Sequence, residues 1–162
     1  MNATSTAAKR ATTAEAHQFL TFRVGGEEYG IEILKVQEIK GLTTITPIPN
    51  APPYVSGVMN LRGSVVPVME LRSCFGLPAR EDATFAVIVV VKVGPKVVGL
   101  VADAVSEVLD TTADQIEPAP EIGIAPAQQF VTAVTRAGDR LVGLLAVERV
   151  ACVGDLDTSL AA

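Results

Sequence analysis

Apolar and polar residues alternate along most of this chain with the two-residue period of a β-strand. Glycine and proline interrupt the alternation at short intervals, and both favour turns. One segment, FAVIVVVKV (85–93), is continuously apolar, which is typical of a strand buried on both faces. The pattern therefore predicts an all-β protein with strands at 19–24, 29–33, 34–39, 54–61, 64–71, 85–93, 97–105, 130–137 and 140–147.

Helices are predicted only as short elements between strands and at the C-terminus. The segment RSCFGLP (72–78) has room for one short helix before its glycine and proline end it. The small and polar residues 1–17 have no apolar periodicity and predict a disordered leader. The folded domain is thus expected to span 18–152, and 153–162 to form a tail or short helix.

The chain contains the same pattern twice. With a constant shift, residues 22–39 align with 91–108, so that Gly30 meets Gly99 and glutamate 38 meets glutamate 107. A proline-rich stretch and a second hairpin follow in both copies, at 54–71 and 130–149. An ordered series of hairpin, proline segment and hairpin is much less common by chance than single matching glycines. The sequence is therefore interpreted as an internal duplication.

A duplication of this size predicts two small barrels that pack together. Each copy holds about five short strands, which bury little apolar surface alone, and short strands with regular turns favour barrels. We expect the first barrel at about 18–82 and the second at about 83–152. A single β-sandwich with accidental self-similarity is the alternative.

Composition excludes several classes of function. The net charge of −5 does not provide the basic face that nucleic-acid binding requires, and no apolar run reaches the roughly 18 residues that span a bilayer. The one histidine, His17, lies in the leader, and Cys74 and Cys152 match no metal-site spacing. Isolated cysteines are typical of a reducing cytoplasm. We therefore expect no catalytic residues, no bound metal and no cofactor.

At residues 53–72 the chain reads PYVSGVMNLRGSVVPVMELR, which closely resembles the signature block of CheW, the bacterial chemotaxis coupling family. EEYGIEILKVQEI (27–39), VVGLVADAVSEVL (97–109) and QIEPAPE (115–121) also resemble that family. The resemblance covers about residues 18–151. Glu70 stands where the family usually has Asp before Leu-Arg, which keeps the negative charge.

This resemblance implies a fold and a function. The family fold is two SH3-like five-stranded β-barrel subdomains packed together, and the family has no catalytic activity. It bridges the regulatory domain of the histidine kinase CheA to the cytoplasmic tip of methyl-accepting chemotaxis receptors. The resemblance thus implies a cytoplasmic adaptor, recruited to membrane-associated receptor arrays without inserting into the membrane.

The resemblance places Val36, Glu38 and Arg62 near the receptor. The planar donors of arginine suit such recognition, and Glu38 could orient them; an ordinary solvated ion pair is the alternative. Val36 lies two positions from Glu38, so we expect both on one strand face, Val36 either in the core or in a groove for a receptor helix. Arg62 aligns with the uncharged Ala137-Gly138, so the fold does not require an arginine there.

Gly57, Glu121 and Ile122 are the candidate kinase contacts. Gly57 also has a conformational interpretation, because glycine permits positive φ and close backbone approach. Glu121 and Ile122 fall in an irregular acidic loop, and loops on rigid scaffolds often carry contacts. Ile122 could equally be a buried anchor of that loop.

Two other functions stay open at this point. One is a β-barrel that holds a small apolar ligand, which an empty cavity of ligand size would favour. The other is an adaptor of a chemosensory pathway that does not drive flagella.

We expect the isolated protein to be monomeric or only weakly associating. An adaptor has to offer separate surfaces to two partners, and modest contacts are sufficient because an array multiplies them through effective concentration. Sedimentation velocity at micromolar concentration measures this. A tight obligate dimer would contradict the prediction.

Overall fold

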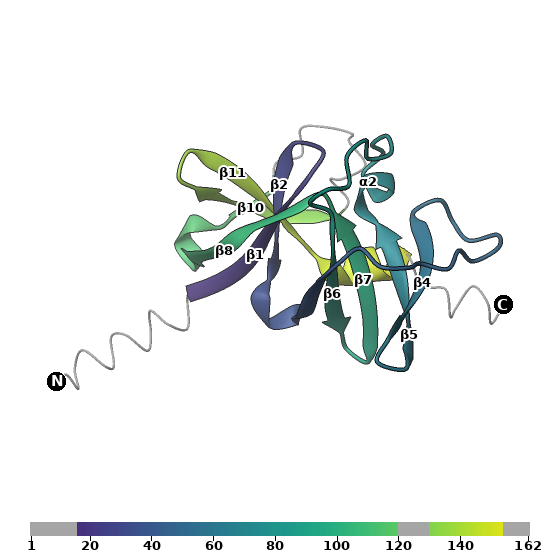
Figure 1. The fold of residues 1–162 in the computed structure, drawn as a ribbon. Coiled ribbons are helices and arrows are strands. Elements are labelled where there is room, and N and C mark those ends of the chain that lie inside the picture. Colours follow the sequence, from purple (N-terminus) through teal and green to yellow (C-terminus); the bar gives the residue numbers. More distant parts are fainter. Residues whose placement is uncertain (1–15, 120–129, 154–162) are drawn as a thin grey trace.

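The computed structural model describes residues 16–119 and 130–153, which form two β-sheets with short helices between or after strands (Figure 1). The predicted all-β class is confirmed. Sheet A has the strand order β8-β1-β2-β11-β10-β9. Its strands are β1 (Ala16–Val24), β2 (Glu27–Glu32), β8 (Ala104–Thr112), β9 (Glu117–Pro118), β10 (Val131–Ala137) and β11 (Arg140–Leu145).

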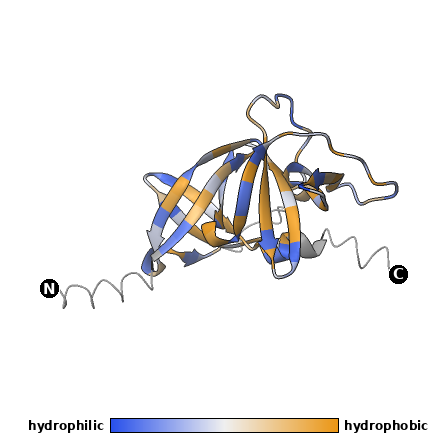
Figure 2. Cartoon of the chain, turned by 60° about the horizontal axis from the view of Figure 1, so that its bottom comes forward, coloured by the Kyte–Doolittle hydropathy of each residue, from blue (hydrophilic) through white to orange (hydrophobic). Residues whose placement is uncertain are grey.

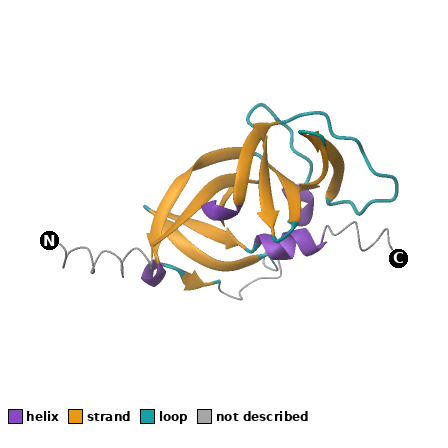
Figure 3. Cartoon of the chain, turned by 90° about the horizontal axis from the view of Figure 1, so that it is seen from below, coloured by secondary structure: helices purple, strands orange, loops and turns teal. Residues whose placement is uncertain are grey.

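Sheet B has the order β3-β6-β7-β5-β4. Its strands are β3 (Val36–Gly41), β4 (Val55–Leu61), β5 (Ser64–Glu70), β6 (Val87–Val93) and β7 (Lys96–Ala102). The helices are short and lie between or after strands (Figure 3), as predicted; they are η1 (Ile33–Lys35), α2 (Leu71–Cys74), η2 (Ala113–Gln115) and α3 (Val147–Val153).

Two predicted boundaries differ from the structure. Strand β1 begins at Ala16, inside the predicted leader, because Ala16 and His17 pair with Thr112 and Thr111 of β8. At the other end, a tail or short helix was predicted only from residue 153, but α3 already starts at Val147, because Val147 and Val150 pack into the largest apolar cluster. Residues 154–162 lie outside the described residues.

The predicted boundary at residue 82 does not separate the two sheets, because each sheet takes strands from both repeats. The hairpin β1–β2 of the first repeat pairs with β8 and β11 of the second. Reciprocally, the hairpin β6–β7 of the second repeat pairs with β3 and β5 of the first. The two repeats have thus exchanged their N-terminal hairpins.

The registers nevertheless agree with the aligned repeats. Gly30 lies opposite Leu144 in the parallel pair β2–β11, and its counterpart Gly99 lies opposite Val68 in the parallel pair β7–β5. Both glycines face barrel interiors, where an added Cβ would lie 3.2 Å from Leu144 Cδ2 and 2.9 Å from Ile88 Cγ2, respectively. The same close packing is therefore built twice.

Each sheet is closed into a barrel by the chain that follows its edge strand. After β3, Thr46 pairs with Val58 of β4, its amide donating to the Val58 carbonyl at 2.8 Å. After β8, Glu117 pairs with Val134 of β10 in the equivalent way. We refer to the two closed sheets as barrel A and barrel B.

Apolar and polar residues alternate along the strands (Figure 2). The buried apolar side chains form three clusters. The largest lies between the sheets and we call it the shared core; it includes Leu20, Phe22, Val24, Tyr29 and Ile31 of sheet A and Met69, Val89, Val91, Val98 and Leu100 of sheet B. Smaller clusters fill barrel B, including Met59, Val68, Ile88 and Val90, and barrel A, including Phe19, Val142 and Leu144. Most of the large apolar side chains therefore join the two barrels.

Gly57 is needed where barrel B closes. It has a φ of +147°, and a Cβ at this position would lie only 2.1 Å from the carbonyl oxygen of Thr46. That carbonyl accepts the closing hydrogen bond from Val58 N–H. The structure thus supports the conformational interpretation of Gly57, whose buried backbone offers no side chain to a partner.

Replacing Gly57 by alanine is expected to lower the free energy of unfolding by about 3 kcal/mol or more, because the Cβ forces Thr46 and Val58 apart at a strained φ. Chemical denaturation measures the change. Gly41→Ala is the matched control, since nothing lies within 4 Å of its Cβ position and its φ is not positive. Equal stability of the two variants would contradict this role.

Candidate functional site

Arg62 and Glu38, distant in sequence, form an ion pair at the surface of barrel B. Arg62 Nη2 donates to Glu38 Oε2 at 2.5 Å. Arg62 occupies the two-residue turn between β4 and β5, and both Arg62 and Gly63 have positive φ, as a type I′ turn requires. Its side chain is 72% exposed. The hairpin turn therefore presents the guanidinium to solvent, with Glu38 of β3 beside it.

The ion pair keeps the Glu38 carboxylate charged and orients the Arg62 guanidinium. The hydrogen bond from Arg62 lowers the pKa of Glu38, so its carboxylate stays ionised and keeps its hold on the guanidinium. An exposed pair of this kind adds little to folding stability because water screens it. Among the described residues, Glu38 is the one side chain to which Arg62 donates a hydrogen bond, so other guanidinium donors can bind a partner.

The expectation that Val36 and Glu38 share a strand face is wrong. Val36 lies opposite Val91 of β6, whereas Glu38 lies opposite the next residue, Val90, so Gln37 is the extra residue of a β-bulge. Val91 belongs to the shared core and Val90 to the interior of barrel B. The bulge therefore turns Val36 to the shared core and Glu38 to the other face.

Aliphatic side chains of the two edge strands lie at the border of the shared core, Val36 and Ile39 on β3 and Val105 and Val108 on β8, and we call them the apolar margin. Val36 is half-buried and packs against the core from the edge strand β3, on which Ile39 is 43% exposed and lies opposite the core residue Val89. Strand β8 of sheet A carries the same bulge, with half-buried Val105 and exposed Val108 at the equivalent positions. Each barrel thus brings an edge strand with two aliphatic side chains to this margin.

Of the predicted kinase contacts, only Gly57 lies within the described residues. Gly57 is buried under the Thr46 segment, as described above. Glu121 and Ile122 lie outside the described residues.

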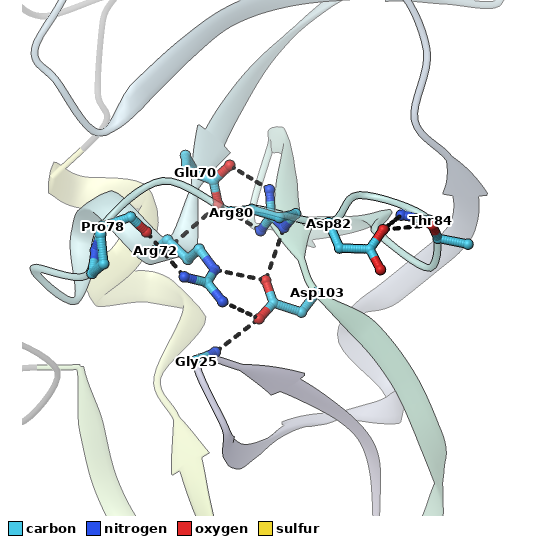
Figure 4. A network of polar contacts seen from close by, with 8 residues as sticks. All are labelled: Gly25, Glu70, Arg72, Pro78, Arg80, Asp82, Thr84 and Asp103. Atoms are coloured by element: carbon cyan, nitrogen blue, oxygen red, sulfur yellow. Dashed lines mark hydrogen bonds and ion pairs between the residues drawn. The ribbon is translucent and has the colours of Figure 1, made fainter.

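A network of ion pairs, which the sequence analysis did not predict, joins the two barrels (Figure 4). Asp103, in the crossing from β7 to β8, accepts from Arg72 Nε and Nη2 at 3.0 and 2.8 Å and from Arg80 Nε at 2.8 Å. It also accepts from the Gly25 amide, in the β1–β2 turn, at 2.9 Å. One carboxylate therefore ties a turn of sheet A to α2 and to the loop after it.

Glu70 completes the network. Its two carboxylate oxygens accept from Arg80 Nη1 and Nη2, both at 2.9 Å, and one also accepts from the Arg72 amide at the start of α2. Arg80, with 9% of its side chain exposed, is thereby neutralised by two carboxylates. Glu70 and Asp103 both lie in blocks that the sequence analysis singled out, 53–72 and 97–109, but neither block indicated that the two carboxylates share Arg80.

The network controls the ionisation of Asp103. Burial by itself would raise the pKa of Asp103, but the hydrogen bonds from Arg72, Gly25 and Arg80 outweigh burial and hold this pKa at about 2. Asp103 thus stays charged through the physiological range.

Barrel A has an arginine near the position aligned with Arg62, although Ala137 and Gly138 themselves carry no charge. Arg140 stands two residues beyond Gly138, the counterpart of Arg62, and its Nη2 donates to Glu107 Oε2 at 2.8 Å. Glu107 occupies the position in β8 that Glu38 occupies in β3. Barrel A therefore has a glutamate–arginine pair of its own, reached from a neighbouring position of the hairpin.

Three features of the described residues concern the alternative functions. Burial raises the pKa of the Cys74 thiol to about 12, so it is a poor nucleophile. No group of three or more potential metal-ligating side chains occurs in the part of the chain that the structure describes. A hollow of about 430 Å³ beside Arg23, Phe85 and Asp103 opens to solvent, whereas the interior of barrel B lacks space even for a methyl group at Gly99.

Comparison with known proteins identifies the family. The model of the CheW-like domain matches residues 18–152. The chain belongs to the CheW-like family. It is 42% identical over 145 residues to the chemotaxis protein CheW of Klebsiella aerogenes, covering 90% of this chain and 87% of that protein. With CheW of Rhizobium meliloti it shares 40% identity over 153 residues, which is 94% of this chain and 92% of the relative.

A solved structure agrees with this assignment. The scaffolding protein TtCheW from Thermoanaerobacter tengcongensis superposes with a TM-score of 0.75 at 30% identity, covering 80% of this chain and 88% of that one. Membership of a family of chemotaxis scaffolds indicates a non-enzymatic adaptor. No helix within residues 16–119 and 130–153 is long and apolar enough to cross a membrane.

Substituting Asp103 by asparagine is expected to destabilise the protein at pH 7 by about 2 kcal/mol or more, because Arg72 and Arg80 lose their shared carboxylate. The folded-state pKa lies below the unfolded value, so this stabilisation is present above about pH 4 and is lost as pH falls towards 2. Denaturation from pH 2 to 7 should show the two proteins converging in acid. Asp139→Asn, in the β10–β11 turn, is the control; a constant gap between Asp103→Asn and wild type would contradict the assignment.

Proposed function

We propose that this chain couples methyl-accepting chemotaxis receptors to a CheA-type histidine kinase as a non-enzymatic adaptor. Membership of the CheW-like family supports an adaptor role. The observation that carries the receptor half of the proposal is the exposed Arg62, oriented by Glu38. The partners in turn imply a position in the cytoplasm at membrane-associated receptor arrays.

The receptor contact spans the edge strand β3, with the Arg62 pair on one face of the strand and the apolar margin on the other. The cytoplasmic tip of the receptors is a helical hairpin, and an amphipathic helix offers aliphatic side chains on one face with polar groups beside them. Val36 and Ile39 on β3 can pack against the aliphatic face. Arg62 can donate to a carboxylate or to a carbonyl at a helix end, as its fork geometry favours.

The kinase contact is proposed at the segment that contains Glu121 and Ile122. The described residues on either side of this segment belong to barrel A, at β9 and β10. Gly57 would then affect a partner only indirectly, by setting the path of the Thr46–Pro47 segment against β4.

Both contacts lie on one rigid body under this proposal. The shared core and the Asp103 network hold barrel A and barrel B in a fixed relation. A fixed relation lets an adaptor place two partners at a defined spacing, and an array then multiplies modest affinities through effective concentration.

The receptor contact is tested with Arg62→Gly. Glycine adopts the positive φ of this turn without strain, so folding stability should be unchanged or slightly raised. Loss of a charge-assisted hydrogen bond should weaken binding of a soluble receptor signalling fragment about tenfold or more. Isothermal titration of the full chain with the fragment, together with thermal melts, measures both effects.

Arg136→Ala is the control, because Arg136 is an exposed arginine on β10 of the other barrel. Normal receptor affinity for Arg62→Gly would remove Arg62 from the site. Failure of the unmodified chain to bind both a receptor fragment and a CheA-like kinase would overturn the proposed function itself.

A further inference from the structure

Within the described residues the chain crosses from one sheet to the other at two places, and ion pairs of opposite polarity hold them. The β7–β8 crossing carries Asp103, which accepts from the guanidinium of Arg72 on α2. The β2–β3 crossing is η1, whose Lys35 donates to a carboxylate oxygen of Glu148 on α3. The helix therefore supplies the cation at one crossing and the anion at the other.

The two helices occupy equivalent places in the repeats. The residue before each helix, Glu70 or Ala146, donates its amide to the carbonyl just before the first strand of the same hairpin, at 2.8 and 2.9 Å respectively. Arg72 and Glu148 are then each the second residue of their helix. Like charges would meet if either helix took the place of the other, so each crossing is specific for its own helix.

The η1 crossing has little packing of its own. None of the residues Ile33–Lys35 is buried, and Leu34 is 94% exposed. Ile33 packs only partly buried against the shared core. A hollow of about 180 Å³, lined by residues of β1, β2 and η1, opens beside the crossing. The ion pair of Lys35 with Glu148 is therefore a main link between η1 and the rest of the molecule.

This crossing sets where β3 begins. η1 ends at Val36, the first residue of β3, and the Val36 amide donates to the Ile33 carbonyl. Val36 and Ile39 are the aliphatic residues that β3 brings to the proposed receptor contact. A displacement of η1 would therefore carry Val36 with it.

Glu148 is placed to restrain η1 because its own helix is anchored. Val147 and Val150, on either side of Glu148 in the chain, are both buried in the shared core. Lys35 Nζ also lies 3.9 Å from Glu32 Oε1. Glu32 directly precedes η1, however, so this second contact does not tie the crossing to another element.

We propose that Glu148 is a positioning residue for the receptor contact: through Lys35 it holds η1 against α3 and so fixes the position of Val36. The inference rests on the proposed function and deepens it. An exposed ion pair adds little to global stability. It acts on binding instead, because a partner that meets an unrestrained segment has to order it at the cost of affinity.

The test reverses the charges of the pair one at a time and then together. Glu148→Lys and Lys35→Glu each place like charges side by side, and each should weaken binding of the receptor fragment about fivefold in isothermal titration. The melting temperature should stay close to that of wild type, because the pair is exposed. The double reversal restores opposite charges and should recover binding to within about twofold of wild type.

Two controls accompany the reversals. A role of Glu148 confined to α3, such as its interaction with the helix dipole in the first turn, would not be rescued by Lys35→Glu. Glu81→Lys, at an exposed position in the loop before β6, makes the same change of net charge away from the pair and should bind as wild type does.

Hydrogen exchange tests the restraint without any receptor. In the full chain, amides of residues 33–38 should exchange severalfold faster in Glu148→Lys than in wild type and return to the wild-type rate in the double reversal. Amides of residues 96–104, at the crossing that Asp103 holds, are the internal control and should not change. Mass spectrometry of peptides from the quenched protein measures both segments.

The outcomes separate this inference from the proposed function. Wild-type affinity of Glu148→Lys, no recovery in the double reversal, or unchanged exchange at 33–38 would each overturn it. Failure of Glu148→Lys to fold would overturn it as well, because the pair would then be needed for folding. A wild-type chain that binds no receptor fragment refutes the proposed function and the receptor role of Glu148 with it, while exchange still decides whether the pair restrains η1.

Discussion

The burial of apolar residues between the two sheets is the constraint on which the rest of the structure depends. Each barrel has an interior of only a few large side chains, whereas the shared core gathers Phe22, Ile31, Met69, Val89 and Leu100 from both sheets. Small β-units cannot bury enough surface alone. Neither barrel has an independent core of that size, so the two fold as one body.

The exchange of hairpins between the repeats strengthens this dependence. Each barrel is completed by a hairpin of the other repeat, so the chain crosses between the sheets at η1 and at Asp103. The second crossing carries the carboxylate that binds Arg72, Arg80 and the Gly25 amide. Apolar packing and a partly buried ion network therefore act at the same junction, which keeps the two surfaces of an adaptor in register.

The two repeats share the same backbone pairing at β3 and β8 but differ in the ion pairs around it. The bulges of β3 and β8 match residue by residue, and each glutamate that follows the bulge has an arginine partner. Glu28 is the main difference, because it gives Arg140 a second carboxylate partner, and Arg140 is 48% exposed whereas Arg62 is 72% exposed.

The sequence by itself determined the strands, their turns and the duplication, because these follow from local periodicity and from glycine and proline. It also paired Glu38 with Arg62 through the family resemblance, and the structure brings these side chains into contact. Only the tertiary structure decided which strands share a sheet, because hydrogen-bonded partners far apart along the chain leave no local signal. The bulge at Gln37, the partners of Asp103 and the contact of Glu28 with Arg140 are non-local in the same way. A one-residue bulge reverses the face of every following side chain, so periodicity alone could not place Val36 and Glu38 on opposite sides of the sheet.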